Sequence, residues 1–308
     1  MELFLLLVQI LGNLLILILL YDFFAQPFRF YGMDPLTRFV WGAARKICSP
    51  FESFARSIIR IPERDLAPLF TVLVVIVCRG LLYGGAIVYS SSTPISFFLG
   101  MTMSFLDLFL RLLIPGILFL LYMDIQLSRH QDTFTGNVMV MLIHDVVKRF
   151  IVMIRKLLPS YRPLYVFLSV FIILGVLYWI LLLATLLPFE STGTLDLAPG
   201  VLMPEVIGSG SPALLRQPLI LFVSVMVHLT HMFLFGIFIL LLLNMITGFS
   251  GLDPYDRTSI LLGLVVAPWL AVSRRYFGWA RAGVVDFSVA ILLILIWIVL
   301  GVVDELLP

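Results

Sequence analysis

Six stretches of almost unbroken apolar residues constrain this chain more than any other feature. A helix needs about 20 such residues to cross the hydrocarbon core of a bilayer. The six stretches are Leu3–Leu20, Leu66–Tyr89, Ile95–Met123, Leu164–Leu187, Leu219–Ile246 and Val284–Val303. Of the 308 residues, 61% are hydrophobic and 12% are charged, whereas soluble domains average roughly 45–50% and about 25%. The sequence therefore predicts an all-α, polytopic membrane protein with about six transmembrane helices.

The positions of the basic residues predict the orientation of these spans. Three long loops, roughly 21–65, 124–163 and 247–283, contain 17 of the 20 Lys and Arg residues. Six spans place all three loops on one face, and the positive-inside rule makes that face cytoplasmic. Both termini and the loop 188–218 then lie outside. This extracytoplasmic loop carries three acidic residues against the single Arg216.

The long loops also contain amphipathic patterns. In the first loop, apolar residues recur at helical spacing opposite basic ones: Leu36, Phe39, Val40, Ala43 and Ile47. The second loop has a similar stripe between Ile143 and Ile154. Such stripes are typical of helices lying in the cytoplasmic membrane interface, although packing on other protein would give the same pattern. The apolar segment 258–273 is short and contains Pro268, so we interpret it as interfacial or re-entrant rather than as a seventh span.

One pattern recurs three times between apolar runs. Its clearest copy combines Asp253-Pro254, the pair Arg274-Arg275 and Asp286; an earlier copy has Asp34-Pro35, Arg56 and Asp65, and the weakest has Asp132 and Arg155-Lys156. We therefore divide the chain into hairpin-like repeat unit 1 (1–90), degenerate unit 2 (95–187), the outer loop (188–218) and unit 3 (219–308). Basic residues at the cytoplasmic ends meet anionic headgroups, and an Asp at a helix start accepts backbone N–H bonds. The residues given this interface and topology role are Arg56, Arg60, Asp65, Arg155, Lys156, Arg274, Arg275 and Asp286.

The third unit resembles the YggT (YlmG) family of small bacterial and plastid membrane proteins. The resemblance rests on Asp253, Pro254, Pro268, Arg274, Arg275, Asp286 and Ser288. Members usually have one or two units, so three units with an outer loop are a departure. The resemblance implies a bacterial inner-membrane protein, with a plastid membrane as the second choice. It also implies a role among those linked to the family, which include osmotic tolerance, cell-division and nucleoid organisation, and maturation of cytochrome b-type complexes. It argues against a standard enzyme.

Three charged residues fall inside the predicted spans. Spans two and three form a hairpin that turns near Ser92-Thr93, which places Arg79 and Asp107 at similar depth. Arg111 lies one helical turn beyond Asp107 and shares its face. Isolated charges in a bilayer cost several kcal/mol, so ionisable residues there indicate pairing or function. We expect an Arg79–Asp107–Arg111 cluster that either locks the helices together, lines an ion or proton path, or contacts a partner subunit.

Two histidines, His228 and His231, share one face of the fifth span. They are interpreted as interhelical hydrogen-bonding groups, with contact to a cofactor in a larger complex as the alternative. Two histidines on one helix do not ligate both sides of a haem, and no carboxylate in that span completes a metal site. Cys48 and Cys78 are expected to be free thiols. The sequence predicts no resident cofactor and no metal site.

The function favoured by these patterns is non-catalytic: an accessory, assembly or scaffold subunit of a membrane protein complex. No catalytic triad, P-loop, dinucleotide fingerprint or CxxC motif occurs. The first alternative is an ion channel or transport component that uses Arg79, Asp107 and Arg111, and the second is a cofactor-contacting subunit that uses His228 and His231. The expected partners are anionic lipid headgroups and other integral membrane proteins or further copies of the chain. Nucleic acid is not expected, because the basic loops carry apolar stripes.

Overall fold

The computed structural model describes residues 2–26, 35–58, 65–91, 95–128, 138–155, 163–191, 193, 215, 217–249, 257–282 and 285–306. Its helices are α1 (Glu2–Ala25), α2 (Pro35–Ile58), α3 (Ala67–Ser91), α4 (Ile95–Leu106), the π-helix η2 (Asp107–Leu113), α5 (Ile114–Leu127), α6 (Val138–Arg155), α7 (Pro163–Ser191), α9 (Pro218–Phe249), α10 (Arg257–Phe277), the 3-10 helix η7 (Gly278–Ala280) and α11 (Ser288–Leu306). Two short antiparallel strands, β1 (Arg281–Ala282) and β2 (Val285–Asp286), pair Arg281 with Asp286. The predicted all-α class is confirmed.

Six of the described helical segments are long and apolar enough to cross a membrane, which confirms a multi-pass fold. They are Leu3–Ala25, Ala67–Tyr89, Ile95–Leu127, Tyr165–Glu190, Pro218–Thr247 and Ser259–Ala280. The first five agree with the predicted spans. The sixth differs, because it belongs to α10, whereas the apolar part of α11 (Ser288–Val302) is shorter than a full span.

The difference at α10 has a physical cause at Pro268. A proline inside a helix removes one backbone hydrogen bond and crowds the preceding turn, so the sequence favoured an interrupted segment. In the structure α10 continues through Pro268 to Phe277. Val265 and Val266 are fully buried, and Trp269 packs against the same core. Packing on both sides of the proline thus holds the helix together.

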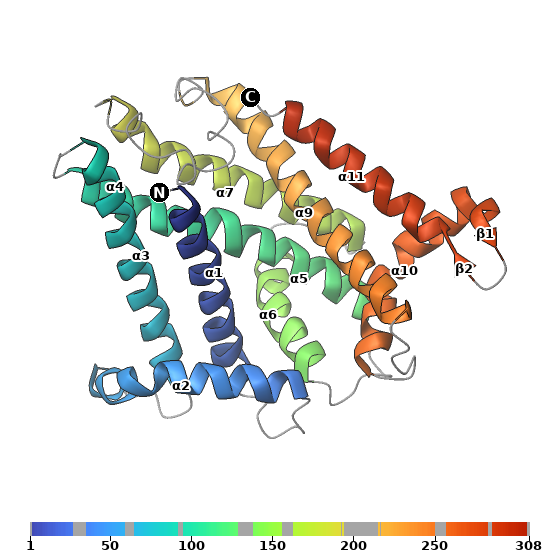
Figure 1. Ribbon diagram of the computed structural model, residues 1–308, viewed down its shortest axis with the longest axis horizontal. Helices are drawn as coiled ribbons and strands as arrows, with labels where there is room; N and C mark the ends of the chain where they lie inside the picture. Colours follow the sequence, from blue (N-terminus) through green and yellow to red (C-terminus); the bar gives the residue numbers. More distant parts are fainter. Residues whose placement is uncertain are drawn as a thin grey trace.

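Two groups of helices lie at the two sides of the view, with α5, α6 and α7 between them (Figure 1). In one group α1 and α3 stand side by side, and α2 lies across their lower ends. In the other, α9 and α11 run side by side, and α10 lies near their lower right ends. Both chain ends lie toward the upper edge of the view, away from α2.

Each predicted repeat unit contains three helices that contact one another. The trios are α1–α2–α3, α5–α6–α7 and α9–α10–α11, and all three pairs within each trio are in contact. In every trio the middle helix lies within one of the three long basic loops, 21–65, 124–163 or 247–283.

Small residues bring α3 and α4 into backbone contact. Gly80 and Gly84 on α3 face Gly100 on α4, where an added Cβ would lie 2.2 Å from the Gly84 nitrogen and 2.7 Å from the Gly80 oxygen. This is the small-xxx-small packing that lets helices approach closely in membranes. Ser104, one turn after Gly100, donates its hydroxyl to the Ile76 carbonyl at 2.8 Å. The close approach positions the charged residues that follow.

Candidate functional site: a buried ion-pair cluster

The structure brings Arg79, Asp107 and Arg111 together between α3 and η2. The Arg79 Nη1 lies 2.7 Å from Asp107 Oδ2, and the Arg111 Nη1 lies 3.2 Å from Asp107 Oδ1. The three side chains are 2%, 6% and 11% exposed, respectively. Because burial from water strengthens the attraction between opposite charges, this carboxylate holds two helical segments together.

Three residues outside the predicted cluster complete its hydrogen bonds. Arg79 donates from Nη1 to Asn13 Oδ1 at 2.6 Å and from Nε to Ser104 Oγ at 3.0 Å, and its Nη2 donates to the Ser104 carbonyl. Gln9 donates from Nε2 to Asp107 Oδ1 at 3.1 Å. The cluster therefore links α1, α3, α4 and η2.

The contribution of α1 was not predicted, although its sequence carries a signal. Gln9 and Asn13 lie one turn apart in an otherwise apolar helix, and Gly12 lies between them. A Cβ at Gly12 would come within 3.2 Å of Arg79 Cδ. Amides at i and i+4 beside a glycine mark the face of α1 that packs against the arginine.

Tyr83 lies one turn beyond Arg79 on α3. The Arg79 guanidinium carbon lies 5.8 Å from the centre of its ring, which allows a cation–π contact. Tyr83 is only 1% exposed, and its hydroxyl has no hydrogen-bond partner among the described residues. The ring thus covers the charged cluster with an aromatic face.

The π-helix η2 places Asp107 and Arg111 on one side of the chain. Pro115 follows one residue after η2, and in a regular α-helix its ring would crowd the carbonyl four residues earlier, that of Arg111. The helix widens ahead of this clash, and the Ile114 N–H bonds to the Phe109 carbonyl, five residues back. A wider turn brings residues four apart nearly into line, and such turns occur often at functional sites.

The cluster is chemically suited to holding helices together. The two Asp107 oxygens accept bonds from Arg79, Arg111 and Gln9, while Arg79 donates to three different residues. A buried charge pair becomes favourable when further hydrogen bonds satisfy both partners. A structural lock is therefore the role that this geometry fits best.

The predicted histidines lie apart from the cluster, on α9. His228 is 1% exposed and makes an edge contact with Tyr178 of α7, with ring centres 6.0 Å apart. His231 is partly exposed. His228 thus packs between α9 and α7. Within the described residues, no group of three or more His, Cys, Asp or Glu side chains could hold a metal ion.

The predicted interface residues occupy several kinds of position. Asp65 Oδ1 accepts the Ala67 N–H at 3.0 Å, which is the capping interaction of an Asp at a helix start. Arg274 and Arg275 are exposed in the last turn of α10, and Asp286 is on β2, just before α11. Arg56 lies within α2 and Arg155 ends α6. Arg60 and Lys156 fall outside the described residues.

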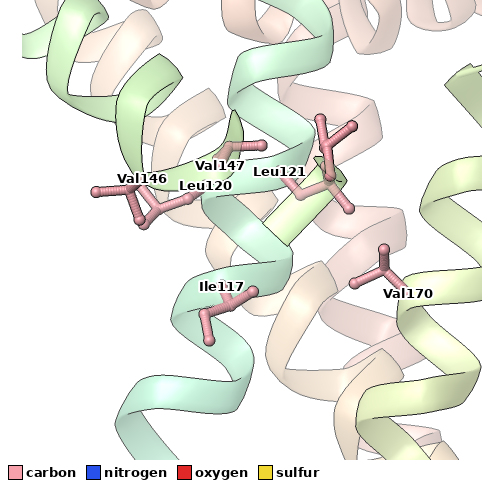
Figure 2. A pocket seen from close by; sticks show the side chains of 7 residues that line it. Ile117, Leu120, Leu121, Val146, Val147 and Val170 are labelled. Atoms are coloured by element: carbon pink, nitrogen blue, oxygen red, sulfur yellow. The ribbon is translucent and has the colours of Figure 1, made fainter. Parts of the chain in front are cut away.

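A second polar link and a small pocket lie between α5 and its neighbours. His144 Nδ1 of α6 lies 3.0 Å from Asp124 Oδ1 of α5. Figure 2 shows the nearby pocket, which is lined by Ile117, Leu120, Leu121, Val146, Val147, Ile151 and Val170. Its volume of about 10 Å³ is close to the minimum that holds one water molecule. The pocket is therefore too small and too apolar to be a substrate site.

Comparisons with protein-family models, with curated proteins and with solved structures found no match.

Proposed function

We propose that this protein is a non-catalytic accessory, assembly or scaffold subunit of a membrane protein complex. The observation that supports this most directly is the hydrogen bonding of the charge cluster. The charged groups bond to one another and to neighbouring side chains of the same protein. Asp107 accepts bonds from Arg79, Arg111 and Gln9. Arg79 also donates to Asn13 and Ser104. A transport path needs polar groups that exchange partners with a passing ion.

The proposal predicts stable association with other integral membrane proteins. After cross-linking in native membranes and extraction in mild detergent, the tagged protein should migrate with a fixed set of subunits at constant stoichiometry. Recovery of a homo-oligomer alone, with ion flux in liposomes, would contradict the proposal and support the transport alternative.

The transport alternative has one observation in its favour, the π-helix that carries Asp107 and Arg111. In that case Asp107 would contribute to flux, and Asp107→Asn would reduce it in proteoliposomes. Under the proposed function, the same variant affects assembly or stability and no flux is present to change.

We also propose that the protein lies in a bacterial inner membrane with its basic loops in the cytoplasm and both termini outside. The concentration of Lys and Arg in three loops supports this, and so does the resemblance to the YggT family at Arg274, Arg275 and Asp286. A reporter fused after Pro308 should be active only as an extracytoplasmic reporter. If α10 and α11 both span the bilayer, the fusion will instead report a cytoplasmic C-terminus and this topology will be rejected.

A further inference from the structure

We propose that α2 forms a binding site for the headgroups of anionic phospholipids, with Arg38, Arg45 and Lys46 as its cationic groups. The inference goes beyond the proposed function and does not depend on it. It rests on how the described part of α2 divides into three faces, each with a different environment.

The first face of α2 packs on the protein. Ala44 is fully buried and Cys48 is 3% exposed, and both belong to a small core with Ile16 and Leu19 of α1 and Val72 of α3. The Thr71 hydroxyl lies 3.7 Å from Cys48 Sγ. These contacts fix α2 across the lower ends of α1 and α3 (Figure 1). Because α1 and α3 are long enough to span the bilayer, α2 lies at the depth where a span ends and headgroups begin.

The second face is basic and exposed. Arg38, Arg45 and Lys46 are all exposed, and the segment from 38 to 50 contains no acidic residue. Among the residues that the structure describes, none forms an ion pair with these three cations. Their charge is therefore available to an anion outside the described part of the chain, and the attraction of cations to an anionic membrane surface is greatest within a Debye length of it.

The third face is apolar and exposed. Phe39 is 74% exposed and lies beside Lys46, seven residues later on the same side of the helix. On the other flank of the basic face, Arg45 Cζ lies 5.0 Å from the centre of the Trp41 ring. An interfacial helix of this kind buries its aromatic residues at the boundary between headgroups and acyl chains while its cations meet phosphates. Nucleic acid or an acidic soluble protein would offer charge but no apolar layer for Phe39. The lipid headgroup region offers both.

Lipid selectivity tests the proposal. The full-length protein is reconstituted in phosphatidylcholine bilayers, and the association of spin-labelled phosphatidylglycerol is compared with that of spin-labelled phosphatidylcholine. We expect the wild type to prefer phosphatidylglycerol and to lose part of this preference at high salt. In the variant R38Q/R45Q/K46Q, each removed cation should lower the preference by up to about fivefold.

A charge-conserving variant, R38K/R45K/K46R, is the matched control and should keep the preference of the wild type. Since the three side chains are exposed, both variants should retain the thermal unfolding midpoint of the wild type. The proposal is overturned if the glutamine variant selects phosphatidylglycerol as strongly as the wild type does. It is also overturned if the charge-conserving variant loses selectivity, or if a short RNA displaces phosphatidylglycerol from the protein.

Discussion

Replacing Asp107 with alanine is expected to destabilise the protein by about 3–5 kcal/mol, the usual cost of leaving a buried ion-pair partner uncompensated. Arg79 would lose its carboxylate partner while remaining 2% exposed, and Arg111 would lose the same partner. The measurements are the unfolding midpoint in detergent and the yield of extracted protein. The matched control is Asp124→Ala, because Asp124 pairs with a half-exposed histidine and not with a buried arginine. A variant at Asp107 that unfolds like the wild type would contradict the lock.

An apolar replacement of the whole cluster separates structure from function. In the triple variant R79M/D107L/R111M no charge remains in the cluster, and replacements of a buried ion pair by apolar residues are often neutral or stabilising. We expect it to recover most of the stability lost in Asp107→Ala. If the triple variant is stable and still assembles with its partners, the charges serve only to hold the helices. Stability together with failed assembly would assign them a contact role.

Replacing Gly100 with valine is expected to separate α3 from α4. The added Cβ would lie 2.2 Å from the Gly84 nitrogen and 2.5 Å from its Cα, and these backbone atoms cannot rotate away. Overpacking typically costs about 1–3 kcal/mol, and we expect this substitution to reach or exceed the upper end. Gly116→Val is the matched control for helix propensity, because a Cβ at Gly116 meets nothing within 4 Å.

The same substitution should also weaken the charge cluster. Ser104 lies one turn after Gly100, and its Oγ accepts a hydrogen bond from Arg79 Nε at 3.0 Å. When the helices separate, this bond and the 2.7 Å ion pair to Asp107 lengthen. Gly100→Val and Asp107→Ala should therefore be less than additive when they are combined. Full additivity would show that the two features are independent.

Much of the fold follows from the sequence, because the membrane leaves few choices. An apolar run in a bilayer must be helical to satisfy its backbone, so composition alone located five of the six helices that are long and apolar enough to cross a membrane. α10 differs from the prediction in its continuity, because a local rule about Pro268 competed with tertiary packing of Val265, Val266 and Trp269. Helix continuity through a proline depends on neighbours that the local sequence does not specify.

The sequence predicted the charged residues of the cluster but did not predict the two amide side chains that bond to them. Arg79, Asp107 and Arg111 stand out because charge is rare in a span, and a hairpin places them at equal depth. Asn13 and Gln9 lie in a helix whose sequence is typical of a simple membrane anchor. Their hydrogen-bond partners lie 66 and 98 residues away along the chain. The π-helix depends on how the backbone relaxes ahead of Pro115, which spacing rules based on the α-helix do not describe.

The distance along the chain between Arg79 and Asp107 has a consequence for biogenesis. The two residues are 28 positions apart, and only three residues, 92–94, separate α3 from α4, which η2 continues. If an arginine entered the bilayer without a partner, the full free-energy cost of removing its charge from water would oppose insertion. Because α3 and α4 fit closely through glycine, they can enter as one hairpin, so that the arginine is neutralised as it is inserted. The first helix, which carries amides and no charge in its middle, can insert earlier and be captured when the hairpin arrives.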